Sequence, residues 1–267
     1  MIYEQNFLSD NIPYYSSSKF QKKYMEFFHV DFCHVDTNGF ATIPNIINYL
    51  QETAWQHANK INIGYHTMLK ENLAFVINRM LLKTRRLPVW NEMISVETWI
   101  LPHDHVKAVR EFTIRDNFRN LIAAATISYI IIDLKTRRIR KIPDTITNCF
   151  DNDELFDESI SKLVLNDNKT LIGLHTVKPS DLDMNKHVNN SKYSQWILDY
   201  LPASWRVNYP PCSIQINFHN EMGIDNQVAI YIEENNKRLM VEGIEIKCKK
   251  AIFTASLCFK SKLEKPI

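Results

Sequence analysis

Two segments of the chain carry apolar residues at the spacing of an amphipathic helix. The first follows Thr42, a residue type that caps helix N-termini, and has Pro44 in its first turn. Its apolar stripe consists of Ile43, Ile46, Ile47, Leu50, Ala54 and Ile61. The second begins at Asn189 or Asn190 and ends before Pro202, and its stripe consists of Tyr193, Trp196, Ile197, Tyr200 and Leu201. The pattern predicts one central helix in each half of the chain.

Most of the remaining chain alternates apolar and polar residues with the period of a β-strand. The alternating segments are 94–100, 106–114 and the apolar run 121–132 in the first half, and 214–218, 228–232, 239–241, 244–246 and 251–259 in the second. Each half is therefore predicted to contain a strand, one long helix and then several antiparallel strands. The predicted fold class is α+β.

An acidic, turn-forming segment separates the two halves. Residues 151–159 have the sequence DNDELFDES, and a polar NDNK follows at 166–169. We interpret residues 151–169 as a linker between an N-terminal domain at 23–150 and a C-terminal domain at 170–267. Residues 1–22 show no steady period and are predicted to form a loosely held lead-in.

The two halves also resemble each other just before their helices. The sequence DTNGF at 36–40 precedes the first helix as DMNKH at 183–187 precedes the second, at an offset of 147 residues. This alignment places His187 where the first half has Phe40.

A second match lies further along each half. Residues 85–96 align with residues 219–230 at an offset of 134, and this pairs Leu87 with Glu221. The second half thus has the polar pair His187 and Glu221 where the first half has the apolar pair Phe40 and Leu87. The repeat predicts that the second half carries chemistry and that the first half holds an apolar group.

Composition excludes several classes of protein. Only five glycines occur in 267 residues, against a usual share of ~7%, and they are far apart in the sequence. A phosphate-binding loop needs clustered glycines, so Walker-type and Rossmann-type nucleotide sites are excluded, as are collagen-like and low-complexity chains. A net charge of +2 gives no nucleic-acid signature.

Apolar runs and cysteines indicate where in the cell the protein is expected. The longest nearly uncharged apolar run, 121–132, is too short to span a bilayer, and no signal peptide is evident at the N-terminus. Five scattered cysteines without a CxxC motif indicate reduced thiols and a cytoplasmic protein. His103 and His105 form a close pair without a further ligand at zinc spacing, so no metal site is predicted.

Four polar residues surround the predicted start of the second helix: Asp183, Asn185, His187 and Asn190. Unpaired backbone N–H groups at a helix N-terminus favour a carbonyl oxygen or a developing negative charge, and an imidazole exchanges protons near neutral pH. The alternative is a capping cluster that only satisfies helix N–H groups. The repeat favours chemistry, because Phe40 serves at the equivalent place in the first half.

Glu221 follows the predicted strand 214–218 and precedes a turn that contains Gly223. As an isolated residue it is a turn carboxylate. Next to His187 it could act as a general base or a nucleophile. Spacing alone does not bring the two side chains together, so both interpretations stay open at this point.

A basic run occupies seven residues near the end of the first half. Its members are Lys135, Arg137, Arg138, Arg140 and Lys141. In a chain of net charge +2 this is a local patch. It is either a solvated strand end or a surface that attracts an acidic partner or a phosphorylated cofactor arm.

These motifs resemble the acyl-acyl carrier protein thioesterases of plant plastids and bacteria. The segment DLDMNKHVNNSKYSQWILDYLP (181–202) is similar to the signature of that family, NYLQETAWQHA (48–58) to its first helix, and RRIRKIP (137–143) to its basic segment. The resemblance covers nearly the whole chain. It implies a tandem (double) hotdog fold, in which two long central helices are each wrapped by an antiparallel β-sheet and the two sheets lie side by side.

The resemblance also implies an active site. The family's catalytic residues fall on Asp183, Asn185, His187 and Glu221, with Asn189 and Asn190 beside them as supporting residues. The plant enzymes carry a cysteine directly after the glutamate, whereas this chain has Met222, whose thioether is not a nucleophile. The implied mechanism is therefore attack by a water molecule that a carboxylate activates.

The implied function is hydrolysis of an acyl-acyl carrier protein in fatty acid biosynthesis, with release of free fatty acid and without a cofactor. The partner would be acyl carrier protein with a phosphopantetheine-linked acyl chain, which the basic run would meet. The acyl chain would lie against Ile46, Leu50, Trp55, Phe75 and Ile77. The alternatives are an acyl-CoA thioesterase of the same fold and a non-catalytic module that binds acyl chains or carrier protein.

The resemblance also has implications for cellular location and oligomeric state. The transit peptide and hydrophobic anchor of the plant enzymes have no counterpart in this sequence, which favours a cytoplasmic protein. Neither a nucleic-acid partner nor an integral membrane segment is expected. Because two hotdogs in one chain already provide a pair, the protein is expected to be either a monomeric pseudo-dimer or a homodimer.

Overall fold

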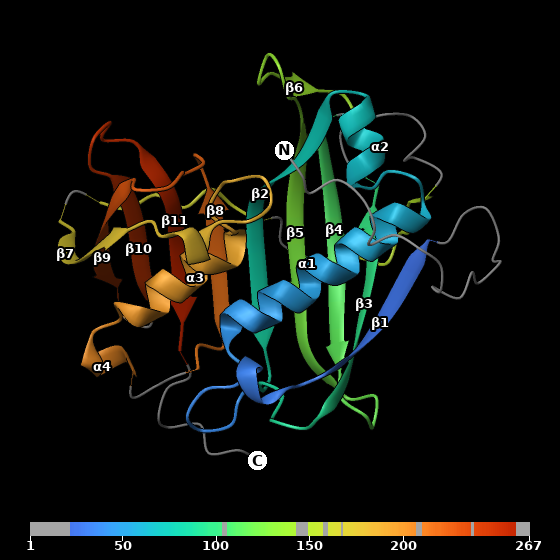
Figure 1. Cartoon of the computed structure of the whole chain (residues 1–267). Helices are drawn as coiled ribbons and strands as arrows, with labels where there is room; N and C mark the ends of the chain where they lie inside the picture. Colours follow the sequence, from blue (N-terminus) through green and yellow to red (C-terminus); the bar gives the residue numbers. More distant parts are fainter. Residues whose placement is uncertain are drawn as a thin grey trace, which may run out of the picture.

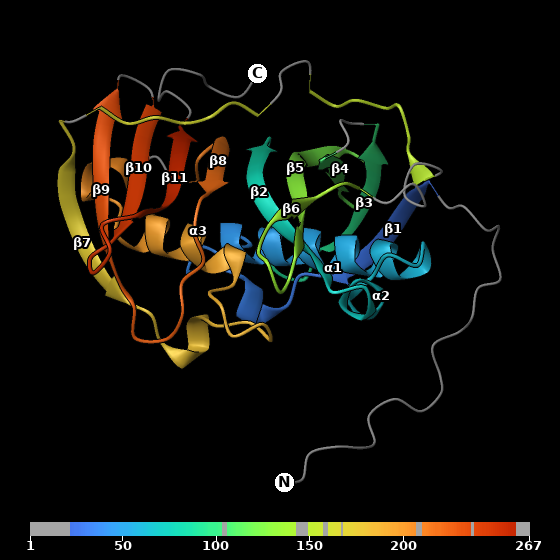
Figure 2. The ribbon, with the colours of Figure 1, turned by 90° about the horizontal axis from the view of Figure 1, so that it is seen from above.

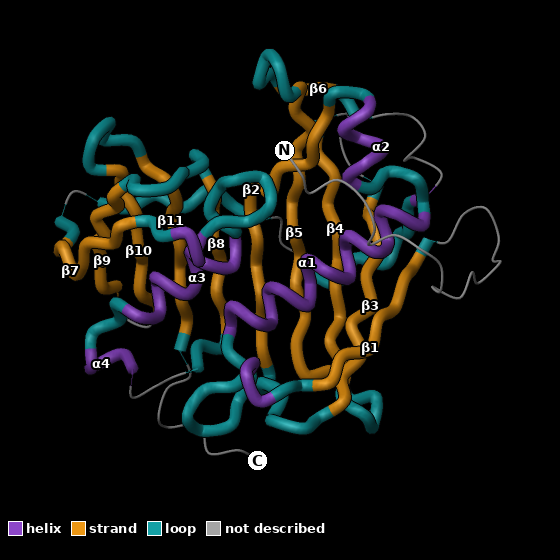
Figure 3. The backbone as a smooth tube through the Cα atoms, viewed as in Figure 1, coloured by secondary structure: helices purple, strands orange, loops and turns teal. Residues whose placement is uncertain are grey.

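The computed structural model of the protein describes residues 22–102, 106–142, 149–156, 160–166, 168–206, 210–235 and 238–259. In these residues the strands form one large antiparallel sheet, and the helices lie on one face of it (Figures 1 and 3). The strand order is β1-β3-β4-β5-β2-β8-β11-β10-β9-β7, with β6 paired to β5. The order of the second five strands mirrors that of the first five, so equivalent strands lie at equivalent places on either side of the β2–β8 pairing.

The two halves contain equivalent elements. The N-terminal half consists of β1 (Lys23–His29), α1 (Ile43–Lys60), α2 (Tyr65–Lys70), β2 (Leu73–Thr84), β3 (Met93–Leu101), β4 (Lys107–Arg115), β5 (Leu121–Asp133) and β6 (Ile139–Arg140). The C-terminal half consists of β7 (Thr170–Thr176), α3 (Asn190–Asp199), α4 (Ala203–Arg206), β8 (Ser213–Phe218), β9 (Gln227–Asn235), β10 (Arg238–Glu245) and β11 (Ala251–Cys258). The predicted lead-in and the end of the predicted C-terminal domain fall largely on residues 1–21 and 260–267, which lie outside the described residues.

The halves join where β2 pairs with β8. This antiparallel pairing runs from Arg79 opposite Asn217 to Lys83 opposite Ser213. Hydrogen bonds across the pairing make the two sheets continuous, so the sheets lie side by side as predicted. One hydrophobic core cluster includes buried residues of both halves.

The two central helices differ in length. Helix α1 has 18 residues and buries the predicted stripe up to Ala54. Helix α3 has only 10 residues, so the expectation of two long helices is correct for α1 and wrong for α3. Tyr200 closes α3, and Pro202, which lacks a backbone N–H, follows it. The short helices α2 and α4 were not predicted.

The structure confirms the repeat before the helices. In residues 36–40 and 183–187, the amide of the Asp donates to the carbonyl of the fifth residue over 2.8 Å in both copies. The Asp carboxylate accepts the amide of the Asn, again over 2.8 Å in both. The fourth residue has a positive φ, 78° at Gly39 and 63° at Lys186. His187 therefore occupies the place of Phe40.

The second match is confirmed in the same way. Each loop supplies a carbonyl to the residue that follows the turn: Ala41 N–H donates to Pro88 O over 2.8 Å, and Val188 N–H donates to Met222 O over 3.0 Å. Leu87 and Glu221, each one residue earlier, are therefore equivalent. Leu87 is buried in the core, whereas Glu221 is exposed at the surface.

The predicted linker crosses the face of the sheet that carries no helix (Figure 2). Its backbone carbonyls accept hydrogen bonds from side chains of the sheet. The bonds are Trp99 Nε1 to Asp153 O, Arg79 Nη1 to Ile160 O, and Gln215 Nε2 and Asn217 Nδ2 to Ser161 O. Since strands of both halves supply these donors, the linker packs against both.

Candidate active site

The turn at 183–187 presents its side chains beside the N-terminus of α3. The carboxylate of Asp183 is occupied by the Asn185 amide, so Asp183 shapes the turn. The side chain of Asn185 is exposed and makes no hydrogen bond within the described residues. Of the two predicted helix caps, Asn189 caps α3, and its side chain accepts the Ser191 amide over 3.0 Å. Asn190 is the first residue of the helix.

The structure brings His187 and Glu221 together. His187 Nε2 lies 3.7 Å from Glu221 Oε2, within ion-pair distance when the imidazole is protonated. Both side chains are partly exposed, at 41% for His187 and 37% for Glu221. The proximity that sequence spacing left open is therefore present: the first half holds Phe40 and Leu87 at the same places, and neither of these can exchange a proton.

Glu221 has a second partner that sequence analysis did not find. Arg137, from the turn between β5 and β6, donates a hydrogen bond from Nη2 to Glu221 Oε2. The arginine belongs to the N-terminal half and the glutamate to the C-terminal half. Local sequence patterns carry no signal for a contact between residues so far apart.

Tyr193 of α3 lies beneath the site. It is buried, and burial raises the pKa of its hydroxyl, with the charges of Glu221 and Asp183 acting in the same direction. Its ring packs against Trp196 and Phe218. Met222 is buried beside it, so the residue that follows Glu221 serves in packing.

The first half provides a closely packed apolar interior. Ile46 and Leu50 of α1 and Ile77 of β2 are buried, and Phe75 is partly buried in a neighbouring cluster. Trp55 lies apart from this set, with 43% of its surface exposed. Nine residues separate it from Ile46, which at 100° per residue places the two on opposite sides of the helix. The expectation that Trp55 shares the interior wall is therefore wrong.

A buried arginine lies under α1 in this interior. Arg110 donates to His57 Nδ1 over 2.7 Å, and burial lowers the pKa of Arg110 to about 10. It forms no salt bridge within the described residues. Arg110 has the parity of Ala108 and Phe112, which are both buried, so the alternation of the strand could have marked it as an inward-facing residue.

The basic run forms the turn after β5. Its five members, Lys135, Arg137, Arg138, Arg140 and Lys141, are all exposed. In Figure 1 this hairpin lies at the upper edge of the molecule, near the junction of the two halves. It is therefore accessible to a partner on the side where Arg137 meets the site.

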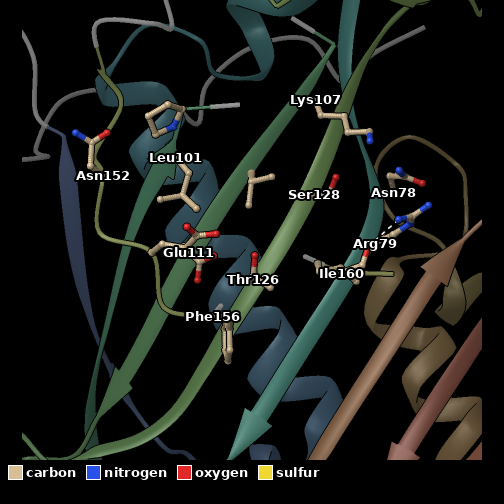
Figure 4. Close-up of a pocket in the computed structure, with 13 residues that line it drawn as sticks. Asn78, Arg79, Leu101, Lys107, Glu111, Thr126, Ser128, Asn152, Phe156 and Ile160 are labelled. Atoms are coloured by element: carbon tan, nitrogen blue, oxygen red, sulfur yellow. Dashed lines mark hydrogen bonds between the residues drawn. The ribbon is translucent and has the colours of Figure 1, made fainter. Parts of the chain in front are cut away.

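A cavity of 370 Å³ lies away from the site, between the N-terminal sheet and the linker (Figure 4). Its lining includes Arg79, Lys107, Glu111, Thr126 and Phe156. Glu111 is only 2% exposed, and its Oε2 has no hydrogen-bond partner within the described residues. No motif or spacing in the sequence marks this glutamate.

No cluster of His, Cys, Asp or Glu among the described residues could hold a metal ion. No helix in that part of the chain has the length and apolar character to cross a membrane. The cysteines are free thiols. His103 and His105 lie outside the described residues.

Comparison with solved structures identifies the fold. The chain matches an acyl-ACP thioesterase from Bacteroides thetaiotaomicron with a TM-score of 0.83 and 23% identity, over 91% of this chain and 100% of that one. This likeness confirms the predicted α+β, double-hotdog fold.

Sequence comparison identifies the family. Residues 21–150 match the model of the acyl-ACP thioesterase N-terminal domain, and residues 166–256 match that of the C-terminal domain. The chain therefore belongs to the acyl-ACP thioesterase family.

Curated relatives agree with this assignment. A chloroplastic palmitoyl-acyl carrier protein thioesterase of Cuphea hookeriana is 31% identical over 198 residues, which are 68% of this chain and 48% of the relative. A chloroplastic dodecanoyl-[acyl-carrier-protein] hydrolase of Cinnamomum camphora is 31% identical over 200 residues, which are 69% of this chain and 52% of the relative. The chain thus spans about half the length of the curated relatives it matches.

Proposed function

We propose that the protein hydrolyses the thioester between an acyl chain and acyl carrier protein and releases a free fatty acid. Family membership supports the reaction class, and the 3.7 Å approach of His187 to Glu221 is the observation that carries the proposal. A carboxylate beside an imidazole, next to the N-terminus of a helix, provides a base, an acid and polar hydrogens for an oxyanion.

In the proposed mechanism Glu221 accepts a proton from water as the water oxygen attacks the thioester carbonyl carbon. Asn185 and backbone N–H groups at the start of α3 stabilise the oxyanion, while Asp183, Asn189 and Asn190 hold this turn and helix start in place. The carbon–sulfur bond then breaks, and protonated His187 gives its proton to the leaving thiolate. A water molecule finally carries the proton from Glu221 to His187, which restores both groups.

We further propose where the rest of the substrate lies. The acyl chain lies in the N-terminal half against Ile46, Leu50, Phe75 and Ile77, which are buried or partly buried apolar side chains between α1 and the sheet. The acidic carrier protein docks on the basic hairpin, whose exposed cations favour such a partner. A single chain supplies both hotdog halves that the proposed reaction needs. The free cysteines support a cytoplasmic location.

The proposal predicts a large loss of turnover when either proton-transfer group is removed. Glu221→Gln and His187→Ala should each lower kcat by about 10²-fold or more, because each removes a positioned acid or base. The measurement is mass-spectrometric detection of free fatty acid from acyl carrier proteins loaded with a series of chain lengths. Glu52→Gln, on the exposed side of α1, removes the same charge away from the site and should leave kcat unchanged.

Three results would contradict the proposal. Near-wild-type turnover by both variants would remove Glu221 and His187 from the mechanism. Faster release from acyl-CoA than from acyl carrier protein would identify an acyl-CoA thioesterase. Tight binding of acyl carrier protein without release of fatty acid would identify a non-catalytic binding module.

A further inference from the structure

The turn that follows β5 is held by one aspartate. The carboxylate of Asp133 accepts the backbone amides of Lys135 and Thr136 over 3.0 and 2.8 Å and the side-chain amide of Asn72 over 3.1 Å. The Thr136 amide is the main cause that holds the pKa of Asp133 below its usual value. The carboxylate therefore stays charged and fixes the shape of the turn.

The backbone of this turn sets the direction of the Arg137 side chain. Its backbone amide donates to Asp133 O over 2.8 Å, and its φ of 58° lies in the left-handed region that arginine rarely adopts. The side chain extends from this backbone to Glu221, in the other half of the protein, and bonds to Oε2. A backbone conformation that is uncommon for arginine is thus imposed at the residue that contacts the site.

The rest of the basic run behaves differently. Within the described residues Lys135, Arg138 and Lys141 form no ion pair, and Arg140 lies 3.9 Å from Asp133. The cations of Lys135, Arg138 and Lys141 remain available to a partner in solution, and Arg140 pairs only with the aspartate of its own hairpin. Arg137 differs because its guanidinium is hydrogen-bonded to a carboxylate of the other half of the protein.

The two carboxylate oxygens of Glu221 have different contacts. Oε2 receives Arg137 and faces His187 at 3.7 Å, whereas Oε1 makes no hydrogen bond or ion pair within the described residues. One oxygen is therefore anchored and the other is left to accept a proton from water. An anchored carboxylate keeps its base oxygen at a fixed angle to the bound thioester.

We propose that Arg137 is a positioning residue for the carboxylate of Glu221 and not a part of the carrier-docking surface to which its sequence neighbours assign it. This inference rests on the proposed function. It separates the hairpin into one residue that acts on the chemistry and four that act on docking. It also makes the site dependent on both halves of the chain.

The test compares two substrates, an acyl chain on carrier protein and the same acyl chain on free pantetheine. Arg137→Gln should lower kcat by about 10²-fold on both, because it releases the carboxylate, and should leave KM for the carrier-bound substrate nearly unchanged. Arg137→Lys should recover most of the lost kcat, since an ammonium can bind the same oxygen. Thermal unfolding of each variant checks that the fold is retained.

Arg119 provides a matched control. It has a φ of 65°, and its hairpin turn is likewise held by an aspartate, Asp116, which accepts the amides of Phe118 and Asn120. Arg119→Gln removes the same charge from the same kind of turn without touching the site. It should leave kcat and KM unchanged on both substrates.

The outcomes distinguish a positioning role of Arg137 from a role in docking the carrier protein. If Arg137→Gln raises only KM for carrier-bound substrate and leaves turnover of acyl-pantetheine intact, Arg137 belongs to the docking surface and the inference is wrong. Added to Glu221→Gln, Arg137→Gln should cause no further loss of kcat, and a further tenfold loss would also overturn it. Wild-type protein that hydrolyses neither substrate would overturn the proposed function, and this inference with it.

Discussion

Two glutamates of this protein lie in opposite environments. Glu221 is partly exposed and has Arg137 and His187 beside it. Glu111 lies in the cavity beneath the linker, where one carboxyl oxygen has no hydrogen-bond partner within the described residues. Burial raises the pKa of Glu111 to about 7, against the effect of a hydrogen bond from Thr126 and with that of the charge on Glu154. The ionised form of Glu111 is therefore unfavourable in the folded state.

The pKa of Glu111 predicts how stability varies with pH. Because the folded pKa of about 7 exceeds the usual 4.5, the folded state holds this proton more tightly than the unfolded state. The resulting stability is complete below pH 4.5 and is lost as the pH rises to 7. Glu111→Gln cannot ionise, so the variant should be more stable than the wild type at pH 8 by about 3 kcal/mol. Urea unfolding at a series of pH values measures the difference.

A surface variant controls for net charge. Glu71→Gln at the end of α2 removes the same charge from an exposed position and should follow the wild-type pH dependence. If Glu111→Gln also follows the wild type at every pH, the buried carboxyl group does not determine this part of the stability curve.

At the scale of elements, the repeated turn before each helix uses one backbone conformation with two different residues. The position with positive φ holds Gly39 in the first half and Lys186 in the second. A side chain costs about 1 kcal/mol or more in this left-handed region, because its Cβ approaches the next carbonyl oxygen. A Cβ at Gly39 would meet no atom within 4 Å, so only the backbone cost applies there.

Adding a side chain at position 39 and removing one at position 186 should change the free energy of unfolding in opposite directions. Gly39→Ala should lower the free energy of unfolding by about 1 kcal/mol, and Lys186→Gly should raise it by up to about 1 kcal/mol. Chemical denaturation measures both. The control is Lys178→Gly, at an exposed residue with φ of −110°, where glycine brings no conformational relief and should destabilise. A destabilised Lys186→Gly would show that the lysine side chain contributes more than its backbone costs.

The elements show what periodicity can predict. Alternation located β3, β5, β8, β9 and β11 closely, because each strand has one face against the core. It divided β10 into two segments, because the third inward-facing position after Leu239 and Val241 is Gly243, which has no apolar side chain. The stripe of the second helix continued to Leu201, although the helix ends at Asp199. An apolar stripe reports which residues are buried, and the residues after the last turn are buried as well.

At the scale of the whole molecule, the repeat predicted more of the site than any single motif. It equated Glu221 with Leu87, and the hydrogen-bond pattern of the two loops confirms this register. It could not predict contacts that break the symmetry of the two halves. Arg137 reaches Glu221 from the other half, and the linker crosses one face of the sheet. Neither contact has a counterpart in the part of the repeat that the structure describes.

The continuous sheet predicts that the halves unfold together. Leu82 of β2 lies opposite Ile214 of β8, and both are buried in the core cluster that includes α1 and α3. Leu82→Ala should therefore lower the free energy of unfolding by about 2–5 kcal/mol, through lost burial and the cavity left behind. Hydrogen exchange measured by mass spectrometry should show equal loss of protection in β4 and β10, because opening either half exposes the shared core.

A second variant tests whether this coupling is a property of the junction. Leu239→Ala truncates an equally buried leucine of β10, away from the pairing of β2 with β8. If the protein is one cooperative unit, this variant should also accelerate exchange in both halves by the same free energy. If each variant changed exchange only in its own half, the halves would fold independently, and the sheet would be two domains in contact. Joint unfolding fits the proposed site, because a catalytic carboxylate in one half that is held by an arginine of the other requires both halves to be folded.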